Sequence, residues 1–134
     1  IQIGENVRID RGVRLLSTNN SKLIIGKKTA IGLYSVLNGG DNITIGDSCL
    51  ISGFVYIQTS MHNHKKGQFI KEQGYSHAPI CIENDVWLGA HSTVLPGCKL
   101  ESGSIIGSNA VVTTSIKSNE IVAGVPAKKI KERN

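Results

Sequence analysis

A six-residue period runs through almost the whole of this chain. Large aliphatic residues recur at every sixth position, in five groups of three repeats. They are Ile3, Ile9, Leu15, Ile25, Ile31, Leu37, Ile45, Ile51, Ile57, Ile82, Leu88, Val94, Leu100, Ile106 and Val112. Extra residues come only after the third repeat of a group, at 21–24, 43–44 and 63–81, with none before the last group. A solenoid that accepts insertions at one corner alone builds its functional surface at that corner.

The period predicts a β-helix. The fifth residue of most repeats is small or slim, as at Val7, Ser35 and Cys49, and the second is often glycine. One short strand and one turn per repeat, three per coil, make a triangular prism, and five coils at the spacing of hydrogen-bonded strands stand roughly 24 Å tall. The alternative is a β-sandwich or barrel, but such folds rarely keep one period over so many residues. Crossover statistics alone predict a right-handed helix.

Composition narrows the choices further. A length of 134 residues fits one domain, and no run of eighteen apolar residues predicts a membrane span. Cys49 and Cys98 fall at the inward fifth position, and three cysteines without a C-x-x-C pair indicate reduced thiols and a cytoplasmic setting. The net charge of +5, with lysines gathered near the end, favours either an anionic ligand or a solvated basic tail. Without basic and aromatic residues interleaved, nucleic-acid binding is not expected.

The last residues break the period. After Val112 the repeat frays, and Val125-Pro126 leads into AKKIKERN, where proline and good helix formers predict a short C-terminal helix. We therefore divide the chain into a β-helix domain over 1–117, with an extruded loop over 63–81, and a C-terminal segment with a short helix over 118–134.

The long insertion marks the corner where chemistry is expected. His62 ends the repeat just before it, and a neutral imidazole on a rigid scaffold is a good general base near neutral pH. The alternative is that His62 only caps a turn. His64 and His77 could join it around a metal, but H-x-H with a distant third histidine is a weak pattern, so no metal site is predicted. His91 falls at an outward position and is expected to face solvent.

Three stretches carry a resemblance to a known family. ENDVWLGAHSTVLPG (83–97), IIGSNAVVTTSI (105–116) and VAGVPAKKIK (122–131) resemble the hexapeptide-repeat acyltransferases, in the branch of galactoside and maltose O-acetyltransferases and xenobiotic acetyltransferases. The repeat match begins at Ile3. The resemblance implies a left-handed parallel β-helix, against the crossover rule. It also implies a homotrimer that binds acetyl-CoA between neighbouring prisms, with the long loop reaching over the adjacent subunit.

The resemblance also implies roles for single residues. His62 matches the family's catalytic base. Trp87 matches a tryptophan beside the pantetheine arm of the cofactor, and Ala90 matches a position, often serine, whose backbone N–H faces the thioester.

Further matches trace the rest of the cofactor groove. Ser108, Thr113 and Thr114 match positions along the pantetheine and nucleotide, and Lys128 and Lys131 match basic residues, often arginine, near the phosphates. Without the resemblance, each of these would be interpreted as an ordinary strand or solvent-facing residue.

The resulting hypothesis is transfer of an acetyl group from acetyl-CoA, with no metal, to a hydroxyl of a sugar or sugar-like acceptor, in surface-polysaccharide biosynthesis. Asn38 and Asp41, at the insertion corner, are candidates for acceptor contacts. N-acetylation of an amino sugar or antibiotic is the alternative within this class. A metal-dependent carbonic-anhydrase-like enzyme and a non-catalytic solenoid that binds a partner are the alternatives outside it.

Overall fold

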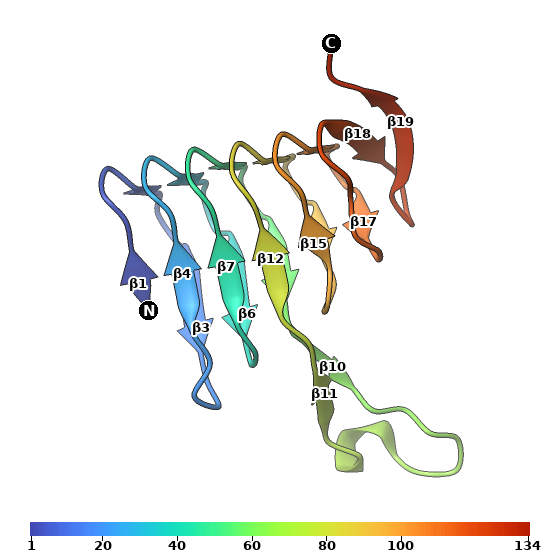
Figure 1. The fold of residues 1–134 in the computed structure, drawn as a ribbon. Coiled ribbons are helices and arrows are strands. Elements are labelled where there is room, and N and C mark those ends of the chain that lie inside the picture. The colour runs from blue at the N-terminus through green and yellow to red at the C-terminus, as the bar shows by residue number, and fades with distance from the viewer.

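The computed structural model describes all of residues 1–134, and the chain winds into a triangular prism of stacked coils (Figure 1). Each complete coil contributes one strand to each of three sheets, and these strands run parallel, so that neighbours in a sheet come from successive coils. The repeat explains this geometry, because two extended residues form a strand and a turn follows. The fourth residue of the repeat adopts a positive φ in that turn, as at Lys28, Ser48 and Asp85. The predicted β-helix is confirmed.

The three faces of the prism are three sheets. Sheet A consists of β1 (Gln2–Ile3), β4 (Leu23–Ile25), β7 (Ile43–Ile45), β12 (Ile80–Ile82) and β15 (Lys99–Leu100). Sheet B consists of β2 (Arg8–Ile9), β5 (Ala30–Ile31), β8 (Leu50–Ile51), β13 (Trp87–Leu88), β16 (Ile105–Ile106), β18 (Glu120–Ala123) and β19 (Lys128–Glu132). Sheet C consists of β3 (Arg14–Ser17), β6 (Val36–Gly39), β9 (Tyr56–Gln58), β14 (Thr93–Val94) and β17 (Val111–Val112).

The coils wind in the left-handed sense. In Figure 1 the strands of sheet A run upward on the near side, and the chain then crosses the top through sheet B. It returns downward behind through sheet C while the coils advance from left to right. The right-handed crossover rule depends on the twist of the strands. The strands here are short, and nine of the nineteen have only two residues. Strands this short impose little twist, so the physical basis of the rule is weak in this fold.

The core is a column of aliphatic side chains along the prism axis. Ile31, Leu37 and Leu88 are fully buried, and so are the small fifth-position residues such as Thr29 and Ser92. Ile3 and Ile9 of the first coil remain exposed because no coil stacks beneath them.

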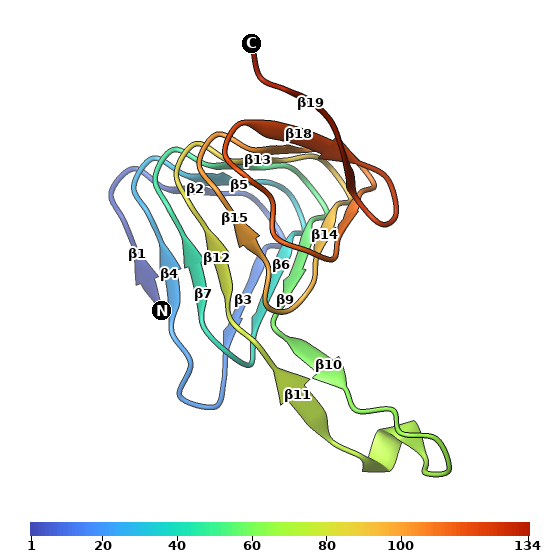
Figure 2. The ribbon, with the colours of Figure 1, turned by 45° about the vertical axis from the view of Figure 1, so that its right-hand side comes forward.

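The C-terminal prediction was wrong in two respects. About five coils were predicted, but a sixth, incomplete coil follows the fifth: Ile116 bridges Leu100, and β18 pairs with β16. No C-terminal helix forms. Residues 128–132 are the strand β19, which pairs antiparallel with β18 (Figure 2). The free edge of β18 offers backbone hydrogen bonds, whereas so short a helix would have to meet its own nucleation cost.

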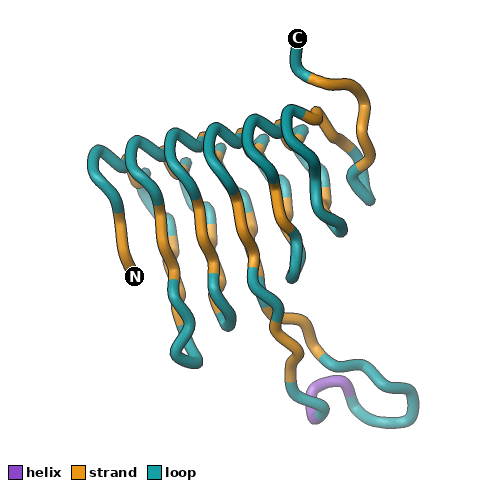
Figure 3. Tube along the Cα trace, viewed as in Figure 1, coloured by secondary structure: helices purple, strands orange, loops and turns teal.

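The long insertion leaves the prism as a hairpin. Its arms are β10 (Ser60–His62) and β11 (Tyr75–His77), joined by a tip that contains the short 3₁₀ helix η1 (Ile70–Glu72) (Figure 3). The predicted loop boundaries, 63–81, need correction, because Ile80 and Cys81 already lie in β12. With only this three-residue helix, the structure has no helix that could span a membrane.

Candidate active site

The hairpin is anchored to the prism at Thr59, the last buried residue before it leaves. The Thr59 hydroxyl donates to the carbonyl of Asn38 at 3.1 Å and accepts from the backbone N–H of Asp41 at 2.9 Å. From there β10 and β11 run outward with Ser60 opposite His77 and His62 opposite Tyr75. His62 therefore stands at the outer end of an arm, not at the corner of the prism itself.

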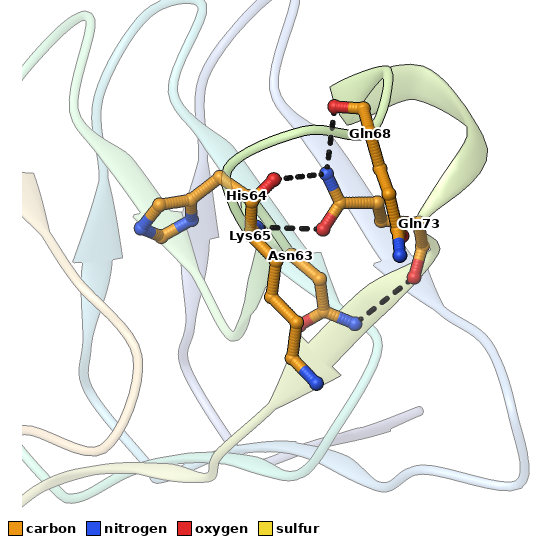
Figure 4. Close-up of a pocket in the computed structure, with 5 residues that line it drawn as sticks. All are labelled: Asn63, His64, Lys65, Gln68 and Gln73. Atoms are coloured by element: carbon orange, nitrogen blue, oxygen red, sulfur yellow. Dashed lines mark hydrogen bonds between the residues drawn. The ribbon is translucent and has the colours of Figure 1, made fainter.

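The tip of the loop is held together by its own side chains. The Gln73 amide accepts from the backbone N–H of Lys65 at 2.7 Å and donates to the carbonyls of Lys65 and Gln68 at 3.0 and 3.1 Å (Figure 4). Asn63 donates from its amide to the Gln73 carbonyl at 3.1 Å. These residues and His64 surround a polar hollow of about 500 Å³ with no hydrophobic lining. The tip of the loop thus has a scaffold made of its own hydrogen bonds.

Three histidines gather on the hairpin, each in a different setting. The ring of His62 lies against that of Tyr75, with centroids 4.4 Å apart. His64 Nδ1 lies 2.9 Å from the carbonyl oxygen of His62, and His77 Nδ1 lies 2.8 Å from the hydroxyl of Ser60. Neither ring nitrogen of His62 has a hydrogen-bond partner in the chain, so both are open to a ligand.

A hollow of about 440 Å³ adjoins His62 on the outward face of sheet C. It is lined by Asn38, Tyr56, Gln58, Ser60, Met61, His62, His64 and Tyr75. Amide side chains offer donors and acceptors side by side, and aromatic rings offer flat apolar surface. A polyhydroxylated ligand with apolar faces matches this lining.

The structure brings one of the two predicted acceptor residues into this hollow. Asn38 lines it, and its amide donates to the Tyr56 hydroxyl at 3.3 Å. Asp41 does not, because its carboxylate accepts from the backbone N–H of Asn42 at 2.7 Å within the turn. Tyr56 and Gln58, which also line the hollow, were not among the predicted site residues. They flank the inward Ile57 on β9, so strand alternation could have identified both as outward-facing residues beside His62.

The predicted cofactor residues begin on the outward face of sheet B. Trp87 is paired with Leu50 on one side and with Ile105 on the other, and its indole N–H donates to the Ser52 hydroxyl at 3.2 Å. Ile105 pairs with Ile121, and Ile121 with Lys131. Trp87 and Lys131 therefore lie in one row of outward residues, three strand spacings or roughly 14 Å apart.

Two lysines of β19 lie on the same outward face of sheet B as this row. Lys128 lies opposite Ala123 and Lys131 opposite Ile121, and neither forms an ion pair. Lys129 is different: the carboxylate of Glu132, 2.9 Å away, raises the pKa of its ammonium group. Thus Lys128 and Lys131 are the free cations of this strand.

Arg133 was not among the predicted site residues. Its guanidinium donates to Asp85 at 2.8 Å and to the carbonyl of Gly103 at 3.2 Å. It borders a small hollow of about 190 Å³ next to Trp87.

The turn after sheet B holds Ala90 and Ser108 in successive coils. Neither backbone N–H makes a hydrogen bond within the chain, so both are available to a ligand. The coils can stack this closely because residue 89 is glycine: a Cβ there would lie 2.6 Å from the backbone nitrogen of Ser108. Thr113 and Thr114 are exposed and follow β17, in sheet C.

One chain does not bring the two groups of predicted residues together. The hairpin with His62 leaves from the end of sheet C, whereas Trp87, Lys128 and Lys131 lie on sheet B, a different face of the prism (Figures 1 and 2). The three histidines of the hairpin also form no cluster with metal-binding geometry within one chain.

Comparison with known proteins identifies the family. The family model described as bacterial transferase hexapeptide (six repeats) matches residues 82–114. The chain is 32% identical to WbbJ of Escherichia coli K12, described as a lipopolysaccharide biosynthesis O-acetyl transferase, over all of this chain and 72% of that protein. This chain belongs to the hexapeptide-repeat acetyltransferase family.

Two further comparisons extend this assignment. The chain is 31% identical to galactoside O-acetyltransferase of Escherichia coli K12, over 98% of its own length and 64% of that protein. The solved structure of galactoside acetyltransferase in complex with coenzyme A superimposes with a TM-score of 0.90 at 30% identity, covering 99% of this chain and 65% of that one. The chain thus spans about two thirds of these members of the family. The matched residues 82–114 include Trp87, Ala90, Ser108, Thr113 and Thr114.

Proposed function

We propose that this protein transfers an acetyl group from acetyl-CoA to a hydroxyl of a sugar, at sites between the subunits of a homotrimer. One observation carries the proposal: the unengaged imidazole of His62 stands over a hollow lined by amides and tyrosines. The names of relatives support the substrate class, since WbbJ and WcaF of Escherichia coli are described as acetyltransferases of lipopolysaccharide and colanic acid biosynthesis. A surface polysaccharide or its precursor is the acceptor that we propose.

The reaction needs a base, an electrophile and a place for negative charge. His62 accepts the proton of the acceptor hydroxyl as its oxygen attacks the carbonyl carbon of the acetyl thioester. The backbone N–H of Ala90 stabilises the resulting oxyanion by a hydrogen bond. The C–S bond then breaks, and the His62 imidazolium returns the proton to the departing CoA thiolate.

Acetyl-CoA would lie along sheet B. Trp87 would contact the pantetheine arm, and the uncapped N–H groups of Ala90 and Ser108 can donate to its amide or thioester oxygens. Lys128 and Lys131 supply positive charge for the phosphates at the far end of the row. Lysine acts there as a point charge without the bidentate geometry of arginine.

The separation of the two groups of residues supports the trimer. His62 on one subunit would face Trp87 and Ala90 of the next subunit, because a single prism presents them on different faces. Thr113 and Thr114 follow β17 of sheet C, the sheet from whose end the hairpin leaves, and would complete the nucleotide end from the His62 side. The buried, free Cys49 and Cys98 fit a reducing compartment, and we propose the cytoplasm, where acetyl-CoA is made.

The first experiment measures acetyl transfer by His62→Ala, with His91→Ala as the matched control. The His91 ring stacks on Phe54 at 5.0 Å, outside the hollow. Loss of the base should lower kcat by about 10²- to 10⁴-fold while acetyl-CoA binding persists, and the control should keep its activity. Turnover by His62→Ala within a few-fold of the unmodified protein would refute the mechanism. An acceptor panel that includes amino sugars separates O- from N-acetylation.

A second experiment tests whether sites lie between subunits. His62→Ala and Trp87→Ala, each poorly active alone, are mixed and allowed to exchange subunits. If sites are shared, some interfaces of a random hybrid combine an intact His62 from one subunit with an intact Trp87 from the next. Each residue is intact in half of the subunits, so about one quarter of the activity should return. If each site lay within one subunit, mixing would restore nothing.

A further inference from the structure

The orientation of the His62 ring has no hydrogen bond to hold it. A catalytic imidazole is ordinarily oriented by a partner on its second nitrogen, which also selects the tautomer. In this chain no protein group contacts either nitrogen within hydrogen-bonding distance. His62 is also exposed and stands on an arm that projects from the prism. Something else must limit its rotation if it is to act as a base.

Tyr75 is the side chain in position to do so. It lies directly opposite His62 in the antiparallel hairpin, and its ring lies 4.4 Å from the imidazole, with planes inclined by 36°. Cross-strand ring pairs at this distance stabilise one another, and the contact leaves the edge nitrogens of the imidazole free. The ring can thus be held by its face while both nitrogens serve the reaction.

Tyr75 is supported in turn by a second histidine. The centroid of the His77 ring lies 6.2 Å from that of the Tyr75 ring, and the two rings are nearly parallel at 21°. His77 is itself fixed by its hydrogen bond to Ser60, its partner across the hairpin. His77 does not line the His62 hollow. Its position is therefore that of a support and not of a substrate contact.

Gly40 connects this support to the rigid prism. It sits in the turn between β6 and β7, against the Ser60–His77 pair. A Cβ on residue 40 would lie 2.9 Å from His77 Nδ1 and would overlap the Ser60 hydroxyl. The φ angle of Gly40 is not positive, so the backbone itself would accept alanine. The absence of a side chain at residue 40 is therefore what permits the Ser60–His77 hydrogen bond at this place.

We propose that Tyr75 is the positioning residue of His62, and that Gly40, Ser60 and His77 hold Tyr75 in register with the prism. The inference rests on the proposed function, in which His62 is the base. It assigns the Gly39-Gly40 turn a role in catalysis at a distance from the substrate. A displacement of about 1 Å in a reacting group can cost up to 10²-fold in rate, so small shifts in this chain of contacts should be measurable.

The test compares steady-state kinetics of Tyr75→Phe, Tyr75→Leu and Gly40→Ala. Tyr75→Phe keeps the ring and should retain kcat within about threefold, whereas Tyr75→Leu should lower kcat by at least about tenfold. Because Tyr75 lines the hollow, its replacement can also raise the KM for the acceptor. Gly40→Ala touches no substrate, so it should lower kcat by about tenfold with both KM values unchanged. Gly53→Ala is the matched control, since a Cβ there meets only ordinary contacts of 3.4 Å or more.

The outcomes separate this inference from the proposed function. If Tyr75→Leu or Gly40→Ala keeps kcat within twofold, or if Tyr75→Phe loses as much as Tyr75→Leu, the positioning role is wrong. His62→Ala is measured in the same assay: if it stays active, the proposed function fails whatever the Tyr75 variants do. Thermal melts of each variant at equal concentration confirm that the fold is retained, which the exposure of the hairpin leads us to expect.

Discussion

Two buried serines at equivalent positions of the β-helix should respond oppositely to the same substitution. Ser35 and Ser92 both occupy the fifth position of a repeat in the turn after sheet B, and both are fully buried. Elsewhere in this column the chain uses Val55 and Ala110, so alanine fits the space. The perturbation is Ser35→Ala compared with Ser92→Ala. Each removes one hydroxyl and leaves a cavity of the same small size.

The Ser35 hydroxyl connects two coils. It donates to the carbonyl of Ser52 at 2.9 Å and accepts from the backbone N–H of Val55 at 3.1 Å. Without it, a buried donor and a buried acceptor lose their partner. Each unsatisfied buried group costs about 1–3 kcal/mol, but the two can partly compensate by moving toward each other, so we expect a loss of about 2 kcal/mol.

The Ser92 hydroxyl has no such partners. The equivalent groups of the next coil are the Gly107 carbonyl and the Ala110 N–H, and these bond to each other at 3.2 Å. Ser92 Oγ is therefore buried without a hydrogen bond. Removing an unpaired buried hydroxyl should leave stability unchanged or raise it by up to about 1 kcal/mol. The predicted gap between the two variants is about 2–3 kcal/mol.

Urea denaturation is the assay, at one protein concentration, because the stability of an oligomer depends on concentration. Equal m-values would show that the variants differ in stability and not in the compactness of either state. The reasoning is refuted if Ser92→Ala is as destabilising as Ser35→Ala, or if Ser35→Ala costs nothing.

Two further predictions concern charge. The Lys99 ammonium at 2.9 Å, and then hydrogen bonds from Ser102, hold the pKa of Glu83 below its ordinary value of 4.5. A depressed carboxyl pKa stabilises the fold above that ordinary value, and the gain is lost as pH falls through the folded-state pKa. The urea midpoint of the unmodified protein should therefore decrease as the pH is lowered below about 4.5, and Glu83→Gln should make that decrease smaller. If the midpoints of both proteins depended on pH in the same way, the Glu83–Lys99 pair would not be its cause. Lys131→Glu should raise the KM for acetyl-CoA several-fold, less so at high salt. Lys28→Glu makes the same charge change in the turn between β4 and β5 and should leave this KM unchanged. An equal rise in KM for both variants would show that only the net charge matters.

Much of the fold could be predicted from spacing alone. The aliphatic period identified the inward positions, such as Leu37 and Leu88, because one large side chain in every six residues must face the axis of the prism. The sixth coil could also have been predicted, because Ile116 and Val122 keep the six-residue spacing after a shortened connection. The strand β19 could not have been predicted in this way. Its conformation depends on the open edge of β18, a partner that local propensity does not include.

The candidate site likewise has features that the sequence determined and features that only the tertiary structure decided. By itself the sequence determined which corner carries the long insertion and that His62 stands beside it, since both follow from counting repeats. Only the tertiary structure decided which outward side chains share a hollow with His62. Asn38, Tyr56 and Tyr75 come from two coils and a hairpin arm, and the pairing of β6 with β9 and of β10 with β11 makes them neighbours. The structure also decided that His62 and Trp87 occupy different faces. The physical reason is that contacts between coils are set by strand register, which depends on hydrogen bonding between residues far apart in the chain.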